Sequence, residues 1–136
     1  MSNFGVKRVL EEIGYRTPIY ALTKSDYCEY EDFINKTKAE VKYNGELKSI
    51  YGHLETIGSG KFPPANKCRK LEGFPGNFQP WEIRTKNLRL FFFYDHGLII
   101  ICGGKKANQK KDINYLKKLE KDIPRDVHQT RITGGS

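Results

Sequence analysis

Two arginines near the middle of the chain have the residue type and spacing most suggestive of a chemical role. Arg84 and Arg89 lie on either side of the dipeptide Lys86-Asn87, which can form the tight turn of a β-hairpin. If the hairpin is symmetric about this dipeptide, the two arginines face each other on neighbouring strands. Like charges in that position repel each other. The arrangement is therefore explained either by an anion that binds there or by solvated edge arginines that pair with Glu82.

Further basic and aromatic residues of the same stretch can act with these arginines on a phosphate. Arginine holds a phosphate through a bidentate fork, and exposed aromatic rings stack on unpaired bases. The set of candidates adds Tyr94, Lys105 and Lys106, with Phe91 and Phe93 as stacking rings. Core packing is the alternative role for the two phenylalanines, and it is favoured if both faces of the sheet are covered.

Such a surface is suited to binding RNA and also to cleaving it. Attack by a neighbouring 2′-hydroxyl group requires no metal, but it needs an acid, a base and a group that stabilises the phosphorane charge. A lysine among other cations can have its pKa lowered enough to act as the base. The sequence has no phosphate-binding loop of the P-loop or dinucleotide type and no metal-ligand motif, so neither a metal nor a cofactor is predicted.

The net charge of +8 is concentrated in one part of the chain. Residues 61–111 contain 11 lysines or arginines and three acidic residues, whereas the charges of the remainder cancel. A polyanion is the natural partner of such a segment. No apolar run approaches the roughly 18 residues of a membrane span. The three scattered cysteines and the lack of signal-peptide features at the N-terminus predict a cytoplasmic protein with no membrane association.

The elements that must position these residues predict an α+β fold. It consists of a small twisted, mainly antiparallel sheet with a helical hairpin packed on one face and a C-terminal helix. Three consecutive strands are expected over residues 81–106, with a second tight turn at 95–97. Alternation along the strands assigns their side chains to two faces. One face carries Trp81, Ile83, Leu90 and Phe92, and the other carries Glu82, Arg84, Arg89, Phe91 and Phe93.

Apolar spacing predicts the remaining elements. Helices are expected over residues 3–13, from Ser25 or Asp26 to about 42, over 46–57 and over 109–123, and extended segments over 18–23 and 67–71. Asn44-Gly45 interrupts the helical hairpin, and Pro124 ends the last helix. The residues from 124 to 136 are expected to form a mobile tail.

Several short motifs occur in an order and spacing typical of one protein family. They are K-L-E-G at 70–73, W-E-I-R at 81–84, L-R-L-F-F-F-Y at 88–94, the apolar strand at 98–102 and G-K-K at 104–106 before a helix. On these motifs, residues 54–123 resemble the RelE/HigB toxins of the RelE/ParE superfamily, in particular the phage-derived, HigB-like branch. The resemblance extends more loosely to 19–57. It divides the chain into an N-terminal extension (1–17), a toxin domain (18–123) and a C-terminal tail (124–136).

The resemblance implies the toxin of a toxin–antitoxin system. Such a toxin is a ribosome-dependent endoribonuclease that cuts mRNA in the decoding site of the 30S subunit and is neutralised by a cognate antitoxin. It implies a compact, mainly antiparallel sheet with helices on one side. By position, the catalytic residues are Arg84, Arg89, Lys105 and Lys106, and the RNA-binding residues are Lys67, Arg69 and Lys70, to which Lys86 and Lys110 of the same basic stretch are added.

One departure from the family pattern concerns the acid and base. Family members often keep an aromatic or basic residue near the end of the last strand, where this chain has Ile101-Cys102-Gly103. Tyr94 or a lysine would then have to transfer the protons. ParE-like relatives inhibit gyrase instead of cutting RNA, so the fold alone does not decide the activity. A gyrase inhibitor and a non-catalytic RNA-binding module therefore stay open as alternatives.

Overall fold

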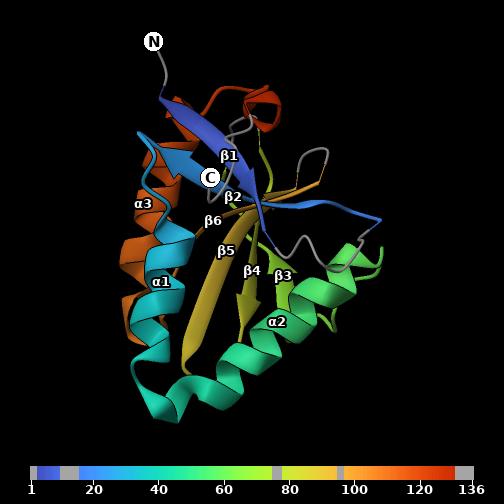
Figure 1. Cartoon of the computed structure of the whole chain (residues 1–136), viewed down its shortest axis with the longest axis vertical. Helices are drawn as coiled ribbons and strands as arrows, with labels where there is room; N and C mark the ends of the chain where they lie inside the picture. The colour runs from blue at the N-terminus through green and yellow to red at the C-terminus, as the bar shows by residue number, and fades with distance from the viewer. Residues whose placement is uncertain (1–2, 10–15, 75–77, 95–96, 131–136) are drawn as a thin grey trace.

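The computed structural model describes residues 3–9, 16–74, 78–94 and 97–130. These form one six-stranded sheet with the strand order β1-β2-β6-β5-β4-β3 (Figure 1). The strands are β1 (Phe4–Arg8), β2 (Ile19–Lys24), β3 (Cys68–Lys70), β4 (Pro80–Arg84), β5 (Leu88–Tyr94) and β6 (Leu98–Lys105). The longer helices are α1 (Glu29–Lys38), α2 (Asn44–Gly58) and α3 (Gln109–Asp122). Neighbouring strands are antiparallel except for β2 and β6, so the predicted α+β fold with a mainly antiparallel sheet is confirmed.

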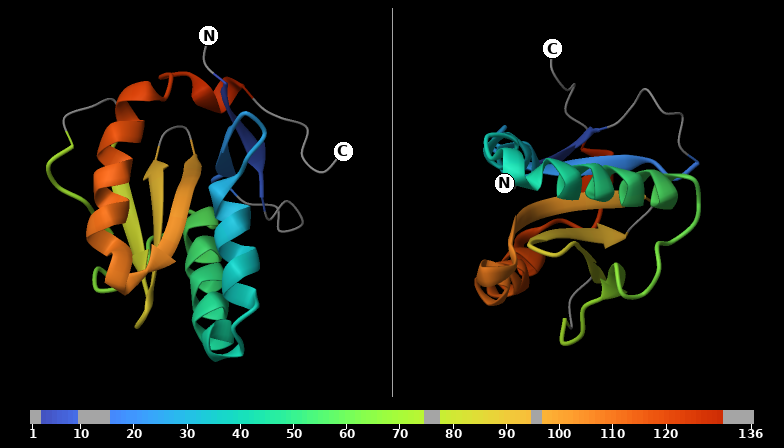
Figure 2. Two further views of the ribbon diagram at one scale, coloured as in Figure 1. Left: turned by 90° about the vertical axis from the view of Figure 1, so that its left-hand side faces the viewer. Right: turned by 90° about the horizontal axis from the view of Figure 1, so that it is seen from below.

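Helices cover both faces of the sheet (Figure 2). The hairpin of α1 and α2 packs on the face that carries Ile83, Leu90 and Phe92. The opposite face, which carries Phe91 and Phe93, packs against α3. The helical hairpin and the C-terminal helix are therefore as predicted, but the arrangement with all helices on one side is wrong. The physical reason is that β5 is apolar on both faces, so each face needs a cover.

The hairpin of β4 and β5 has the predicted register. Arg84 lies opposite Arg89, and Ile83 lies opposite Leu90. The predicted division of side chains between the two faces is also confirmed by the two separate hydrophobic clusters. The proposal that Phe91 and Phe93 stack on bases is wrong, because both rings are buried in the core under α3.

The helix predicted over residues 3–13 is wrong where the structure describes it. Residues 4–8 instead form β1, which pairs antiparallel with β2. Phe4 and Val6 alternate into the hydrophobic cluster on the α3 side, so a strand buries both of them. Residues 10–13 lie outside the described part of the chain.

The expected C-terminal tail needs a similar correction for residues 124–130. A 3₁₀ helix, Val127–Gln129, follows α3, and the side chain of Val127 is buried in the cluster on the α3 side. The backbone N–H of Val6 in β1 donates a hydrogen bond of 2.9 Å to the carbonyl oxygen of Thr130. This segment is therefore packed against the sheet, and residues 131–136 lie outside the described part.

The boundaries of the helical hairpin also differ from the prediction. Ser25 and Asp26 have φ angles of 51° and 68°, which a right-handed α-helix does not accommodate, so they form a turn and α1 begins at Glu29. Asn44-Gly45 is the first turn of α2 and does not interrupt a helix. The turn expected at 95–97 lies outside the described residues except for Gly97.

Candidate functional site

Three arginines converge on one buried carboxylate at the α3 face of the sheet. The Nε atoms of Arg69, Arg84 and Arg89 lie 3.4, 3.8 and 3.8 Å from Oε1 of Glu82. The strand register explains this, because Arg69 lies opposite Glu82 on β3 and β4, and Arg84 lies opposite Arg89 on β4 and β5. These four residues are called the arginine cluster below. Three cations surround a single anion, so the cluster has a surplus of positive charge.

Burial is unequal within the arginine cluster. The side chains of Glu82 and Arg89 are 0% and 2% exposed, whereas those of Arg84 and Arg69 are 32% and 49% exposed. Burial, followed by the neighbouring charge of Arg84, lowers the pKa of the Arg89 guanidinium from its ordinary value. Arginine still remains charged at neutral pH. The partly exposed guanidinium groups of Arg84 and Arg69 are therefore accessible to an anion, whereas that of Arg89 is buried.

The hydrogen bonding inside the arginine cluster leaves capacity for another acceptor. Nη1 of Arg89 donates to the carbonyl oxygens of Thr85 and Leu88 at 2.6 and 2.8 Å. Nε2 of Gln109, the first residue of α3, donates to Oε2 of Glu82 at 2.5 Å. Oε1 of Glu82 and Nε of Arg89 have no hydrogen-bond partner in the protein. The arginines are thus attracted to Glu82 by charge at distances longer than a hydrogen bond, without bidentate pairing.

The turn that aligns the two opposed arginines is fixed from α2. Oε1 of Glu46 accepts hydrogen bonds from Oγ1 of Thr85 at 2.5 Å and from the backbone N–H of Asn87 at 2.7 Å. Its Oε2 accepts a third from Nδ2 of Asn87 at 2.9 Å. Burial alone would raise the pKa of Glu46, but these hydrogen bonds outweigh it and lower the pKa. The carboxylate therefore stays charged and holds the turn in place.

The end of β6 lets α3 approach the sheet beside the arginine cluster. Gly104 lies opposite Arg89 in the ladder, and a Cβ atom at Gly104 would overlap Oδ2 of Asp112 in the first turn of α3. Burial raises the pKa of Asp112, and its Oδ2 has no hydrogen-bond partner in the protein. The glycine of the G-K-K motif thus makes room for a carboxylate and for the helix that supplies Gln109.

Two of the predicted catalytic residues lie away from the arginine cluster. Lys105 follows Gly104 and points to the other face, where its Nζ lies 3.5 Å from Oε2 of Glu40 and 5.7 Å from the centroid of the Tyr43 ring. Tyr94 is at the far end of β5 from Arg89, and its ring packs beside Phe62. The structure therefore does not bring Lys105 or Tyr94 together with the arginines.

The remaining predicted residues surround the β3 edge and the ends of the strands. The carbonyl oxygen of Lys67 accepts a 2.8 Å hydrogen bond from the backbone N–H of Arg84, and Nζ of Lys70 lies 5.6 Å from the centroid of the Trp81 ring on the hairpin side. Lys86, Lys106 and Lys110 have exposed side chains. Of the predicted RNA-binding set, Arg69 thus belongs to the arginine cluster through its charged side chain, and Lys67 contacts Arg84 of the cluster through its backbone.

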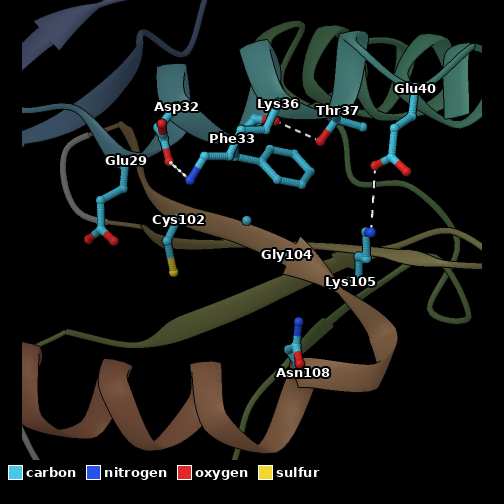
Figure 3. A pocket seen from close by; sticks show the side chains of 11 residues that line it. Glu29, Asp32, Phe33, Lys36, Thr37, Glu40, Cys102, Gly104, Lys105 and Asn108 are labelled. Carbon is cyan, nitrogen blue, oxygen red and sulfur yellow. Dashed lines mark hydrogen bonds and ion pairs between the residues drawn. The ribbon is translucent and has the colours of Figure 1, made fainter.

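A separate cavity of about 380 Å³ lies between α1, the end of β6 and the start of α3 (Figure 3). Its charged side chains include Glu29, Asp32 and Glu40. Lys36 and Lys105 also line it, but Lys36 pairs with Asp32 at 3.0 Å and Lys105 reaches across to Glu40 (Figure 3). This cavity has no surplus of positive charge and is poorly suited to a phosphate.

Comparison with known proteins found no relative. No family model matches the chain. No curated protein and no solved structure matches it either. The function is therefore inferred from the arginine cluster and its surroundings.

Two further observations describe what these residues offer. Within the described ranges there is no group of three or more His, Cys, Asp or Glu side chains that could hold a metal ion. None of the helices in that part of the chain is both long and apolar enough to cross a membrane. The guanidinium groups of the arginine cluster can stabilise negative charge.

Proposed function

We propose that this protein is the toxin of a toxin–antitoxin system and a ribosome-dependent endoribonuclease that cuts mRNA. The observation that carries the proposal is the arginine cluster, with the guanidinium groups of Arg69 and Arg84 partly exposed beside the buried Arg89. It lies in the stretch 61–111 that holds the whole net positive charge. The motifs W-E-I-R and L-R-L-F-F-F-Y, which support the toxin resemblance, supply Glu82, Arg84 and Arg89.

In this proposal the arginine cluster binds the phosphate at the cut site. The 2′-oxygen attacks phosphorus, the P–O5′ bond breaks, and the products are a 2′,3′-cyclic phosphate and a 5′-hydroxyl group. A base takes the proton of the 2′-hydroxyl, and an acid gives a proton to the leaving 5′-oxygen. The guanidinium groups stabilise the negative charge that builds up on the phosphorane oxygens. Arginine suits this role because it stays charged and binds phosphate oxygens in pairs.

Few of the described residues near the arginine cluster could act as the acid or the base in the proton transfers. Tyr94 and Lys105 lie away from the arginines. The exposed Lys86 lies in the turn between Arg84 and Arg89, and the exposed Lys106 directly follows β6, where its backbone N–H donates to the carbonyl oxygen of Asn87 in that turn. Ribosomal groups in the decoding site can contribute to this step, which would account for dependence on the ribosome. The same observation favours a second candidate function, namely RNA binding without cleavage. No observation on the described residues favours a gyrase inhibitor.

The proposal also determines the partners and the compartment. Ribosomes and mRNA place the activity in the cytoplasm. An antitoxin that neutralises the toxin would cover the arginine cluster, and an acidic side chain would complement its surplus charge.

Cleavage of mRNA on programmed ribosomes tests the proposed function. We expect cuts by the wild type that need the ribosome, mapped by primer extension, and a loss of about 100-fold in rate for Arg69→Gln/Arg84→Gln. The matched control is Arg125→Gln, because Arg125 is an exposed arginine just beyond the other end of α3. Arg89 is left intact because it is buried.

The outcomes separate the candidates. Full cleavage by the doubly substituted protein, with its fold verified by circular dichroism, would contradict the assigned site. RNA binding by the wild type without any cuts would favour the non-catalytic module.

A further inference from the structure

A group of aromatic side chains lies on the hairpin face of the sheet, near the edge strand β3. The rings of Phe62 and Trp81 stack with centroids 4.8 Å apart and planes inclined by 20°. The ring of Tyr94 lies 5.7 Å from that of Phe62, inclined by 44°. Nζ of Lys70 lies 5.6 Å from the centroid of the Trp81 ring. Phe62, Trp81, Tyr94 and Lys70 are called the aromatic surface below.

The aromatic surface is open to solvent. Phe62 is 47% exposed and Tyr94 is 40% exposed, whereas Trp81 is partly buried against Phe92. Phe62 and Tyr94 are two of the four large hydrophobic side chains that are exposed in the described part of the chain. Single exposed hydrophobic residues that are scattered over a surface are normal. Exposed aromatic rings that lie together, in contrast, are typical of a binding surface.

The charge around the aromatic surface favours an anionic occupant. Residues 61–71 contain four basic residues and no acidic one. Three of these are lysines, Lys61, Lys67 and Lys70, and all three are exposed. An apolar protein segment would leave these cations unmatched, and an acidic peptide would leave the rings unmatched. Single-stranded nucleic acid offers both flat rings and phosphates, the combination that such surfaces bind.

The aromatic surface and the arginine cluster lie back to back. Trp81 and Glu82 are consecutive residues of β4, so their side chains point to opposite faces of the sheet. The side chains of Arg69 and Lys70 of β3 also point to opposite faces. Arg69 lies opposite Glu82 in the ladder, and Lys70 lies opposite Trp81. Because β3 is the edge strand, a single strand of RNA can pass around it from one face to the other.

We propose that the aromatic surface stacks unpaired bases of the RNA strand whose phosphate is bound at the arginine cluster. The identity of the ligand as RNA rests on the proposed function. Tyr94 then acts as a stacking ring rather than as an acid or base. The rings that contact bases are Phe62, Trp81 and Tyr94, and the predicted stacking pair Phe91 and Phe93 belongs to the core.

Trp81 is the only tryptophan of the chain, so its fluorescence reports on this surface alone. The probes are a short oligouridine and an abasic strand with the same number of phosphates. We expect oligouridine to quench Trp81 and to bind about 100-fold more tightly than the abasic strand, since stacking of a base on each of Phe62 and Tyr94 is worth about tenfold.

Substitution of the rings gives the second part of the test. Phe62→Leu and Tyr94→Leu keep apolar side chains but remove the rings. Each should weaken oligouridine binding, measured by fluorescence anisotropy, by about tenfold and leave binding of the abasic strand unchanged. The matched control is Tyr27→Leu, because Tyr27 is an exposed tyrosine of the turn after β2 and should change neither.

The outcomes separate this inference from the proposed function. Equal binding of the two strands, or oligouridine binding that leaves Trp81 fluorescence unchanged, would overturn base stacking while phosphate binding by the arginines stands. Absence of quenching together with absence of oligouridine binding would also overturn it, and would leave a protein partner as the occupant of the aromatic surface. The ribosome cleavage assay judges the endonuclease independently.

Discussion

The two faces of the sheet around β4 handle positive charge in different ways. On the α3 face, Arg89 is buried and shares the carboxylate of Glu82 with two other arginines. On the hairpin face, the cations are exposed lysines, and the ammonium group of Lys70 lies over the ring of Trp81. A guanidinium tolerates partial burial and offers several fixed donors, whereas an ammonium is strongly hydrated. Charge is therefore part of the protein interior on one face and a property of the surface on the other.

The largest stability effect should follow from removing the buried anion. Glu82→Gln keeps the size of the side chain but leaves Arg89 buried among like charges. We expect the free energy of unfolding to fall by about 3–5 kcal/mol, the usual result of breaking a buried ion pair. Urea denaturation measures it, with the exposed Glu72→Gln as the matched control. A decrease in the free energy of unfolding of less than about 1 kcal/mol would mean that Glu82 and Arg89 do not form a buried ion pair that stabilises the fold.

The neighbouring glycines of β6 allow a direct comparison of the two faces. A Cβ atom at Gly103 would lie 2.6 Å from ring carbons of the buried Phe33, whereas one at Gly104 would meet the carboxylate end of Asp112. We expect Gly103→Ala to cost about 1–3 kcal/mol and Gly104→Ala to cost less, because a carboxylate can rotate away more easily than a packed ring.

Thermal unfolding of both variants measures this difference. Gly52→Ala serves as the control, because nothing lies within 4 Å of a Cβ atom there, and alanine should stabilise the helix by up to about 1 kcal/mol. A larger loss for Gly104→Ala would show that the α3 face is packed more rigidly than the account requires.

A smaller effect is expected at Asp112, next to the arginine cluster. Burial raises the pKa of Asp112 in the folded state. The folded state therefore binds this proton more tightly, and the contribution of the group to stability decreases as the pH rises through the raised pKa. Asp112→Asn should raise the melting temperature at neutral pH and have little effect below the ordinary pKa of aspartate. Destabilisation at neutral pH would indicate a partner for the charged carboxylate.

Glu46 should have the opposite pH dependence. Hydrogen bonds from Thr85 and Asn87 lower its pKa against the effect of burial. Its contribution is complete above the ordinary pKa of glutamate and is lost as the pH falls through the lowered value. Glu46→Gln should therefore lower the melting temperature slightly at neutral pH and not in strong acid. The exposed Glu55→Gln on the same helix is the control, and equal shifts in the two variants would contradict the role of Glu46.

The parts of the site that the sequence predicted are those determined by local spacing. The opposition of Arg84 and Arg89, with Glu82 on the same face, follows from a short symmetric turn and strand alternation. The same alternation puts Lys105 on the face opposite Gly104, so its separation from the arginines was predictable in principle. The resemblance of the G-K-K motif to the toxin family instead predicted that Lys105 acts together with the arginines.

Other features depend on contacts that spacing does not reveal. Glu46 binds the turn residue Asn87, which is 41 positions away in the chain, and Gln109 binds Glu82 from 27 positions away. The burial of Phe91 and Phe93 depends on α3 crossing the second face, and the strand at residues 4–8 depends on pairing with β2. In each case tertiary packing decides a feature for which the local sequence is ambiguous.

The most direct test of the central claim is the salt dependence of single-stranded RNA binding. Each phosphate contact contributes about 0.7 to the slope of log affinity against log salt concentration. If the arginine cluster binds phosphate, Arg84→Gln should reduce the slope by about that amount, and Lys105→Gln, on the other face, should leave it unchanged. An unchanged slope for Arg84→Gln, or an equal reduction for Lys105→Gln, would contradict a phosphate site at the arginine cluster.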